Sequence, residues 1–177
     1  AGVGDAGYGG GVFTAGGGMV IKGNCNLELD SVTFRHTKGV YGGAVHITNN
    51  AAPVVTIKNS NFEESSSSYN GGAMYMVGSP NVKLLGNSFS KCLTTAGTDT
   101  DGNGGAIYAT TCAGLSITDS SFSECTTIAG PGGSGGAVYL AASNVGATVT
   151  NSSFSSCSSL KKGGAMYLDA GNTDVSI

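Results

Sequence analysis

One stretch recurs through this sequence and decides how it folds: Gly42-Gly43-Ala44-Val45-His46-Ile47, a glycine pair, an alanine and an alternating apolar run. Later copies begin at Gly71, Gly104, Gly135 and Gly163, and a weaker copy begins at Gly16. The starts lie about 30 residues apart, a period typical of stacked supersecondary units. The chain is therefore predicted to be a solenoid in which each copy opens one rung.

The remainder of each unit is periodic as well. A phenylalanine stands 18 to 20 residues after the first glycine of each copy from Gly16 to Gly135: Phe34, Phe62, Phe89, Phe122 and Phe154. Five residues before the phenylalanines stand Leu29, Ile57, Leu84, Ile117 and Val149, and seven before them stand Leu27, Val55, Val82, Leu115 and Ala147. Aliphatic positions two residues apart indicate a strand with one buried face.

These columns predict an all-β fold, a right-handed parallel β-helix of about five to six rungs with three short strands each. Equivalent strands should lie about 4.8 Å apart along the axis. We expect a single domain over residues 1–177, with 1–15 as an irregular half-rung or cap and 16–177 as coils that end inside a rung. The side chains expected to be almost fully buried are Leu84, Phe89, Ile117, Phe122 and Val138.

The glycine and phenylalanine motifs resemble the GGA-φ and F-x-x-N repeats of the chlamydial polymorphic outer membrane proteins and related pectin-lyase-like β-helical surface proteins. The resemblance covers about residues 16–168. In place of the asparagine of that family, this chain has Thr37, Ser65, Cys92, Cys125 and Cys157. The resemblance implies an extracellular or cell-surface location and a structural or adhesive role.

The low content of charged residues and the short apolar runs argue against two classes of partner, nucleic acids and membranes. Only 11% of the residues are charged and the net charge is −3, whereas nucleic-acid binding needs clustered Lys and Arg. No apolar run approaches the roughly 20 residues of a membrane span. We therefore expect neither a nucleic-acid partner nor a membrane span in this segment. Because solenoid edges recruit other strands, we expect end-to-end self-association or continuation in a longer repeat chain.

The sequence contains five cysteines, and three of them form what we call the cysteine column: Cys92, Cys125 and Cys157. Adjacent rungs bring their Cα atoms within the range that a disulfide accepts. Two interpretations are open, at most one bridge within the column or small buried hydrophobes that fill a bend. A bridge between Cys25 and Cys112 is also open, since both precede a second strand, but the predicted register places them three rungs apart and such a bond would contradict it.

Two polar stretches are weak site candidates. Asp99, Asp101 and Asn103 match the first half of a calcium loop, D-x-D-x-N-G, although Thr110 stands where a bidentate glutamate is needed. We favour a polar turn over a calcium site there and expect no other cofactor. Asn151 begins an Asn-x-Ser sequon, yet it also lies in a bend position and is better explained as a turn residue.

The alternation of the glycine motif directs one aromatic column outward, which we call the tyrosine stripe: His46, Tyr75, Tyr108, Tyr139 and Tyr167. It either stabilises the sheet by stacking or offers a contact surface for another protomer or a glycan. Glycosidases need two carboxylates flanking a sugar, and we find no such motif and no catalytic residue. We expect a non-catalytic extracellular β-helix, with a carbohydrate-binding or polysaccharide-degrading β-helix as the alternative.

Overall fold

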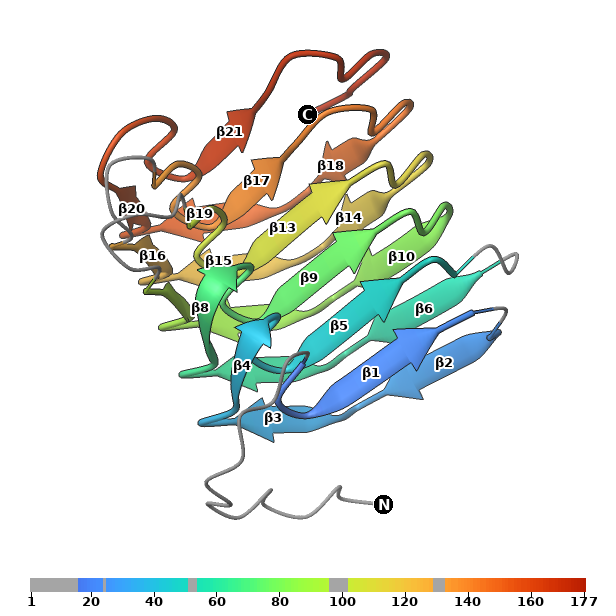
Figure 1. Cartoon of the computed structure of the whole chain (residues 1–177), viewed down its shortest axis with the longest axis horizontal. Helices are drawn as coiled ribbons and strands as arrows, with labels where there is room; N and C mark the ends of the chain where they lie inside the picture. Colours follow the sequence, from blue (N-terminus) through green and yellow to red (C-terminus); the bar gives the residue numbers. More distant parts are fainter. Residues whose placement is uncertain (1–15, 24, 51–53, 96–101, 129–132) are drawn as a thin grey trace.

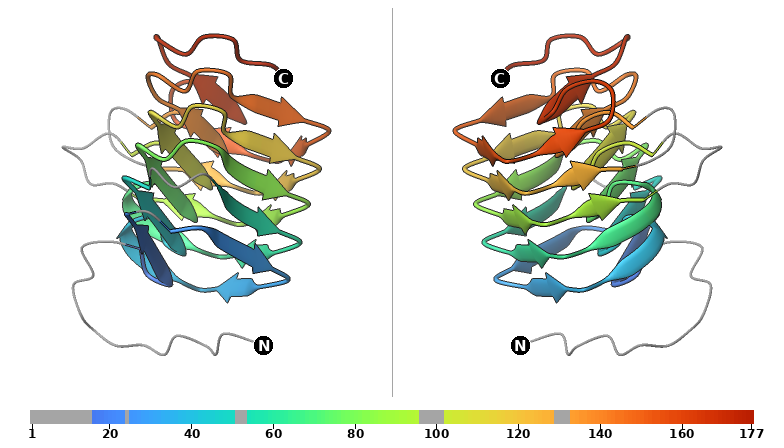
Figure 2. Two further views of the ribbon diagram at one scale, coloured as in Figure 1. Left: turned by 90° about the vertical axis from the view of Figure 1, so that its right-hand side faces the viewer. Right: turned by 90° about the vertical axis from the view of Figure 1, so that its left-hand side faces the viewer.

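The structure, a computed structural model, describes residues 16–23, 25–50, 54–95, 102–128 and 133–177, and every structural statement below refers to these residues. The chain coils into successive turns that stack from the N-terminal part to the C-terminal part (Figure 1). Views from the two sides show the turns as parallel layers along one axis (Figure 2). The architecture is a parallel β-helix, which confirms the predicted fold class.

Four parallel sheets run along the axis, each with one strand from every turn. The first sheet contains β1 (Met19–Lys22), β5 (Val45–Thr48), β9 (Met74–Val77), β13 (Ile107–Thr110), β17 (Val138–Leu140) and β21 (Met166–Leu168). The second contains β2 (Leu27–Asp30), β6 (Val55–Lys58), β10 (Val82–Leu85), β14 (Ser116–Thr118) and β18 (Thr148–Thr150).

The third and fourth sheets are made of shorter strands. The third contains β3 (Thr33–Arg35), β7 (Asn61–Glu63), β11 (Ser88–Ser90), β15 (Ser121–Ser123) and β19 (Ser153–Ser155). The fourth contains β4 (Lys38–Tyr41), β8 (Ser66–Asn70), β12 (Leu93–Thr94), β16 (Thr126–Thr127) and β20 (Ser158–Ser159).

The prediction of three strands per rung was wrong, because the fourth sheet was not foreseen. Its inward position is polar rather than aliphatic: Thr94 and Thr127 are buried there and donate hydrogen bonds to the carbonyl oxygens of Gly104 (2.8 Å) and Gly135 (3.1 Å). Each carbonyl belongs to the first glycine of a glycine pair. A buried hydroxyl thus satisfies a backbone acceptor where the chain bends into the next turn, and no apolar column marks the strand.

The core is built from the columns that the sequence identified. Leu84, Phe89, Ile117, Phe122 and Val138 are each at most 1% exposed, as predicted. The strands stack in register, so that Phe89 pairs with Phe62 below and Phe122 above. Neighbouring phenylalanine rings are 4.6 to 5.2 Å apart, centroid to centroid, and nearly parallel. The interior is one continuous stack of like side chains along the axis.

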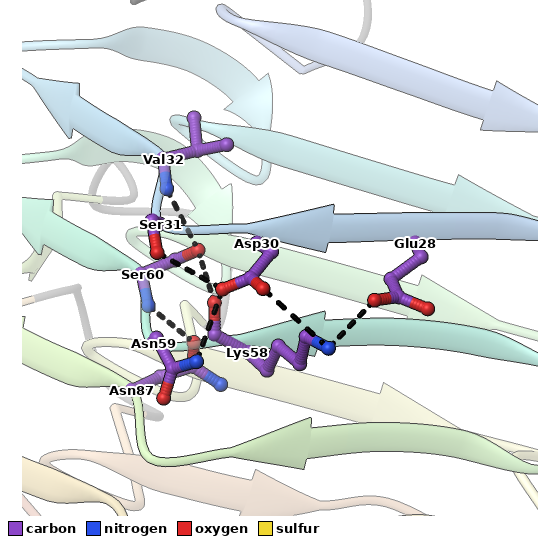
Figure 3. A network of polar contacts seen from close by, with 8 residues as sticks. All are labelled: Glu28, Asp30, Ser31, Val32, Lys58, Asn59, Ser60 and Asn87. Carbon is purple, nitrogen blue, oxygen red and sulfur yellow. Dashed lines mark hydrogen bonds and ion pairs between the residues drawn. The ribbon is translucent and has the colours of Figure 1, made fainter. Parts of the chain in front are cut away.

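A second set of ladders lies inside the bends, where strands end and backbone N–H groups lose their sheet partners. In the bend between the second and third sheets, Ser60 Oγ accepts a hydrogen bond from the N–H of Val32, and Asn87 Oδ1 accepts one from the N–H of Ser60 (Figure 3). Ser120 and Ser152 continue the series with the N–H groups of Asn87 and Ser120. Each of these side chains therefore accepts a hydrogen bond from a backbone N–H of the neighbouring turn.

Asn87 offers a direct test of these ladders. Its side chain is 1% exposed, accepts from the Ser60 N–H at 3.0 Å and donates to the carbonyl of Ile57 at 2.8 Å. Asn87→Ala should lower the free energy of unfolding in urea by about 1–3 kcal/mol for each of the two groups left unpaired. Asn87→Ser should cost less, because serine already fills this position at Ser60 and Ser120. Equal losses for the two variants would contradict the ladder explanation.

Candidate interaction surface

The tyrosine stripe lies along the outer face of the first sheet. His46, on β5, pairs in register with Tyr75 on β9, which pairs with Tyr108 on β13. Tyr139 on β17 and Tyr167 on β21 continue the column. The structure therefore brings all five residues of the stripe together in one line parallel to the axis, because the register of the first sheet does not shift between turns.

The rings of the stripe stack on one another rather than lying flat on the surface. Tyr75 and Tyr108 are 5.1 Å apart with planes 12° apart, and Tyr108 and Tyr139 are 5.5 Å apart with planes 4° apart. The two end pairs deviate, since His46 meets Tyr75 edge-on and Tyr167 is tilted by 37° from Tyr139. Between these ends the ring faces cover each other, so that a sugar could not stack on them as it does on an open aromatic platform.

Two further tyrosines extend the stripe at its N-terminal end, and sequence reasoning missed both. The Tyr41 ring, on β4, lies 4.8 Å from the ring of Tyr75 and 5.1 Å from that of Tyr69 on β8. Tyr41 and Tyr69 precede the glycine pairs by one and two residues. A tyrosine just before two successive glycine pairs was a usable signal, but the fourth sheet that carries these residues had not been recognised.

Burial and hydrogen bonding shift the pKa values of the ionisable groups in and beside the stripe. His46 Nδ1 is buried without a hydrogen-bond partner, and burial lowers the pKa of the imidazole, which favours its neutral form. The Tyr139 hydroxyl donates to Asp169 Oδ2 at 2.8 Å. Hydrogen bonds from the Ala170 N–H and then from Tyr139 lower the pKa of Asp169. The stripe therefore presents a neutral aromatic column with one carboxylate beside it.

The tyrosines should titrate at higher pH in the folded chain than in the unfolded one. Burial raises the pKa of Tyr75 to about 12 from its ordinary value of 10.0, and it also raises the pKa of Tyr108. Between these pH values the unfolded chain loses the Tyr75 proton while the folded chain keeps it, so that stability falls as pH rises. Ultraviolet difference titration should show late tyrosine ionisation, and Tyr75→Phe should remove part of it. Titration of all tyrosines near pH 10 without unfolding would contradict the burial of the stripe.

Charged side chains on the other faces pair along the axis. Lys58 Nζ lies 2.7 Å from Glu28 Oε1 and 3.4 Å from Asp30 Oδ2, one turn toward the N-terminus (Figure 3). Hydrogen bonds from Asn59 and Ser31, in that order of effect, lower the pKa of Asp30. The network therefore favours the ionised form of Asp30.

The basic segment of β3 and its following bend is paired in the same way. Arg35 Nε contacts Glu63 Oε2 at 2.8 Å, and His36 Nδ1 contacts Glu64 Oε2 at 2.9 Å. Both pairs are exposed and join residues in adjacent turns, so each is worth little individually. His36 and Glu64 share a bend position with left-handed backbone, φ 54° and 50°.

Of the three residues proposed as calcium ligands, the structure describes only Asn103. Asp99 and Asp101 lie outside the described residues. Asn103 Oδ1 accepts a hydrogen bond from the Ser134 N–H at 3.0 Å, and the Asn103 N–H donates to Asn70 Oδ1 at 2.8 Å. Within the ranges described, no group of three or more His, Cys, Asp or Glu residues could hold a metal ion. Asn103 is thus part of a bend ladder, which supports the interpretation as a polar turn.

Asn151 stands in the bend after β18. It is exposed and adopts a left-handed conformation with φ 48°, as turn residues do. Its amide donates to Asp119 Oδ1 in the turn below. Asn151 therefore acts as a bend residue, and glycosylation at Asn151 stays a prediction.

All five cysteines are free in the structure. Cys92 and Cys125 are fully buried and Cys157 is half-buried. Cys25 and Cys112 do not pair. They lie three turns apart, with Asn50 and Ser79 at the same bend position in the two turns between them, as the hydrogen bonds from the backbone N–H groups of that bend show. Burial raises the pKa of Cys112 to about 11, which makes its thiol unreactive at neutral pH.

The comparisons with known proteins agree with this architecture. A sequence model of the family described as "Right handed beta helix region" matches residues 12–177. A search of curated proteins and a search of solved structures gave no match. As for membrane insertion, the described ranges include no helix that is both long and apolar enough to cross a bilayer.

Proposed function

Since the chain belongs to the family of right-handed β-helix proteins, we propose that it is a non-catalytic structural or adhesive module, located outside the cell or on its surface. The observation that carries this proposal is that ladders run uninterrupted from turn to turn on the outer faces as well as in the core. The stacked rings of Tyr75, Tyr108 and Tyr139 are the clearest example. Continuous ladders of this kind are expected in a stiff, elongated structural protein.

The carboxylates support a structural role in preference to catalysis. Glu28 and Asp30 both contact Lys58, Glu63 contacts Arg35, and Asp169 accepts from Tyr139. A glycosidase needs one carboxylic acid whose pKa is raised so that it can donate a proton. The pKa values of Asp30 and Asp169 are instead lowered, which favours the ionised form of both.

The proposal includes contacts along the axis. β1 and β21 are the outermost strands of the first sheet, and each pairs on one side only within the described ranges. A further copy, or further repeats of a longer chain, would continue the sheet there by parallel strand pairing. Glycans are a second proposed partner class, but they would contact hydroxyl edges or loops, because the ring faces of the stripe are covered.

Surface labelling tests the location and with it the role. Antibodies raised against the folded chain should label intact cells that produce it, and external protease should remove the label while an internal marker protein is spared. Labelling that requires permeabilised cells would overturn the proposed location.

A second measurement addresses catalysis. The purified chain, incubated with acidic and neutral polysaccharides, should release no more reducing ends than the heat-denatured chain does. Turnover that is lost in Asp30→Asn or Glu28→Gln, with the fold unchanged by circular dichroism, would overturn the non-catalytic assignment. Negative-stain electron microscopy of the same sample distinguishes rods longer than one chain from single particles.

A further inference from the structure

The cysteine column places three thiols on adjacent turns at one bend. The strands that follow it stack in register, with Leu93 opposite Thr126 and Thr126 opposite Ser158. Cys92, Cys125 and Cys157 each immediately precede one of these residues. The three cysteines are therefore neighbours along the axis, and their Cα atoms lie about one strand spacing, roughly 4.8 Å, apart.

The sulfur atoms of the column also contact carbonyl groups of the turn that precedes their own. Cys157 Sγ lies 3.4 Å from the carbonyl oxygen of Ser155 in its own turn and 3.6 Å from that of Phe122, one turn toward the N-terminus. Cys125 Sγ contacts the carbonyl of Phe89 in the same manner at 3.6 Å. Cys157 Sγ is thus already turned toward the rung that carries Cys125, and a rotation of the Cys125 side chain would bring the two sulfur atoms together.

Backbone geometry permits a bond between these two residues. A disulfide accepts Cα separations of about 4.4–6.8 Å, which includes the strand spacing. In-register Cβ atoms are about as far apart as the strands, slightly wider than the roughly 3.5–4.5 Å that a disulfide prefers. The bend must therefore close slightly, and the short strands β16 and β20, of two residues each, are the part of the coil that must move. Cys92 and Cys157 are two spacings apart and cannot pair.

Exposure decides where oxidation begins. Cys92 and Cys125 are 0% exposed, whereas Cys157 is half-buried. We propose that the cysteine column is a redox site in which Cys157 reacts first with a small disulfide, such as oxidised glutathione, and then forms a cystine with Cys125. The bond would join two consecutive turns of the β-helix covalently.

The chemistry balances in two exchanges. The Cys157 thiolate attacks one sulfur of oxidised glutathione, forming a mixed disulfide and releasing one glutathione thiolate, which takes up a proton. Cys125, after losing its proton, attacks Cys157 Sγ and displaces the second glutathione. Two protein thiols are oxidised and one glutathione disulfide is reduced to two thiols.

The rate should be slow at neutral pH and rise with pH. The hydrogen bond with Cys125, followed by burial, raises the pKa of Cys157, so that little thiolate is present at pH 7. The reduced form of the column should therefore persist for longer at neutral pH than at pH 8.5.

Peptide mapping tests the proposal. The folded chain is incubated with oxidised glutathione at pH 8.5, its remaining thiols are alkylated, and it is digested without reduction. The expected result is a Cys125–Cys157 cross-linked peptide, together with a higher urea midpoint that reverts on reduction. Cys157→Ser should abolish the cystine, whereas Cys92→Ser should leave it intact, with the fold of both variants checked by circular dichroism.

Two outcomes would overturn the proposal. One is that all three thiols of the column stay alkylatable after oxidation, with Cys25 alone glutathionylated. The other is that Cys157→Ser still yields a cystine within the column, since oxidation would then not begin at Cys157. The test is made on the purified chain and does not depend on its proposed location or role.

Discussion

Phe122→Ala is expected to reduce the free energy of unfolding by about 3–5 kcal/mol, the range typical of a phenylalanine removed from a packed core. Its side chain is 1% exposed, and its ring lies 4.8 Å from the rings of both Phe89 and Phe154. The truncation would leave a cavity inside a stack whose neighbours are held by their own turns. Because the strands on each side are in register, neither turn can move in without breaking hydrogen bonds of the sheets.

Urea unfolding followed by circular dichroism measures this loss, and Phe154→Ala is the matched control. Phe154 occupies the same position one turn later but is only partly buried, with a single ring neighbour. It should therefore lose distinctly less stability. If the two substitutions cost the same, or if Phe122→Ala costs under about 1 kcal/mol, the stack does not carry the stability assigned to it here.

Gly105→Ala is expected to prevent the native fold, at a cost above about 4 kcal/mol. Gly105 is the second glycine of its pair. A Cβ atom there would lie 2.0 Å from the carbonyl oxygen of Gly136 and 2.7 Å from the backbone nitrogen of Thr126. Both contacts are with backbone of the next turn, so no side chain can rotate away. The second glycine is required by the close approach of consecutive turns and not by its own backbone conformation.

The chain offers two controls for this substitution. Gly164 is the second glycine of the pair in the final described turn, and a Cβ atom there would meet only the carbonyl oxygen of Cys157, at 3.7 Å. Gly146 has φ +68° but no atom within 4 Å of the added carbon, so alanine there would cost conformational strain alone, about 1–2 kcal/mol. In thermal unfolding, the melting temperature should fall in the order Gly164→Ala, Gly146→Ala, Gly105→Ala, with Gly105→Ala the least stable. A folded Gly105→Ala protein of near-normal stability would refute the packing argument.

The sequence by itself determined the solenoid, its turn length and the columns of its core. The reason is that strand alternation is local and is repeated in every turn, so Leu84, Ile117 and the phenylalanines could be aligned without any structure. In-register stacking then follows, because a slip of one residue would expose a whole aliphatic column. The tyrosine stripe and the adjacency of Cys125 and Cys157 could be placed for the same reason.

The features that depend on contacts between turns could not be read from the sequence. The fourth sheet escaped prediction because its inward residues, such as Thr94 and Thr127, are hydroxyl-bearing and pair with a glycine carbonyl that is adjacent only after coiling. Tyr41 reaches the ring of Tyr75 through that same sheet. The packing of one turn on the next also sets the orientation of the tyrosine rings, so that their faces are covered. It likewise leaves Cys157 half-buried, whereas Cys92 and Cys125 are fully buried.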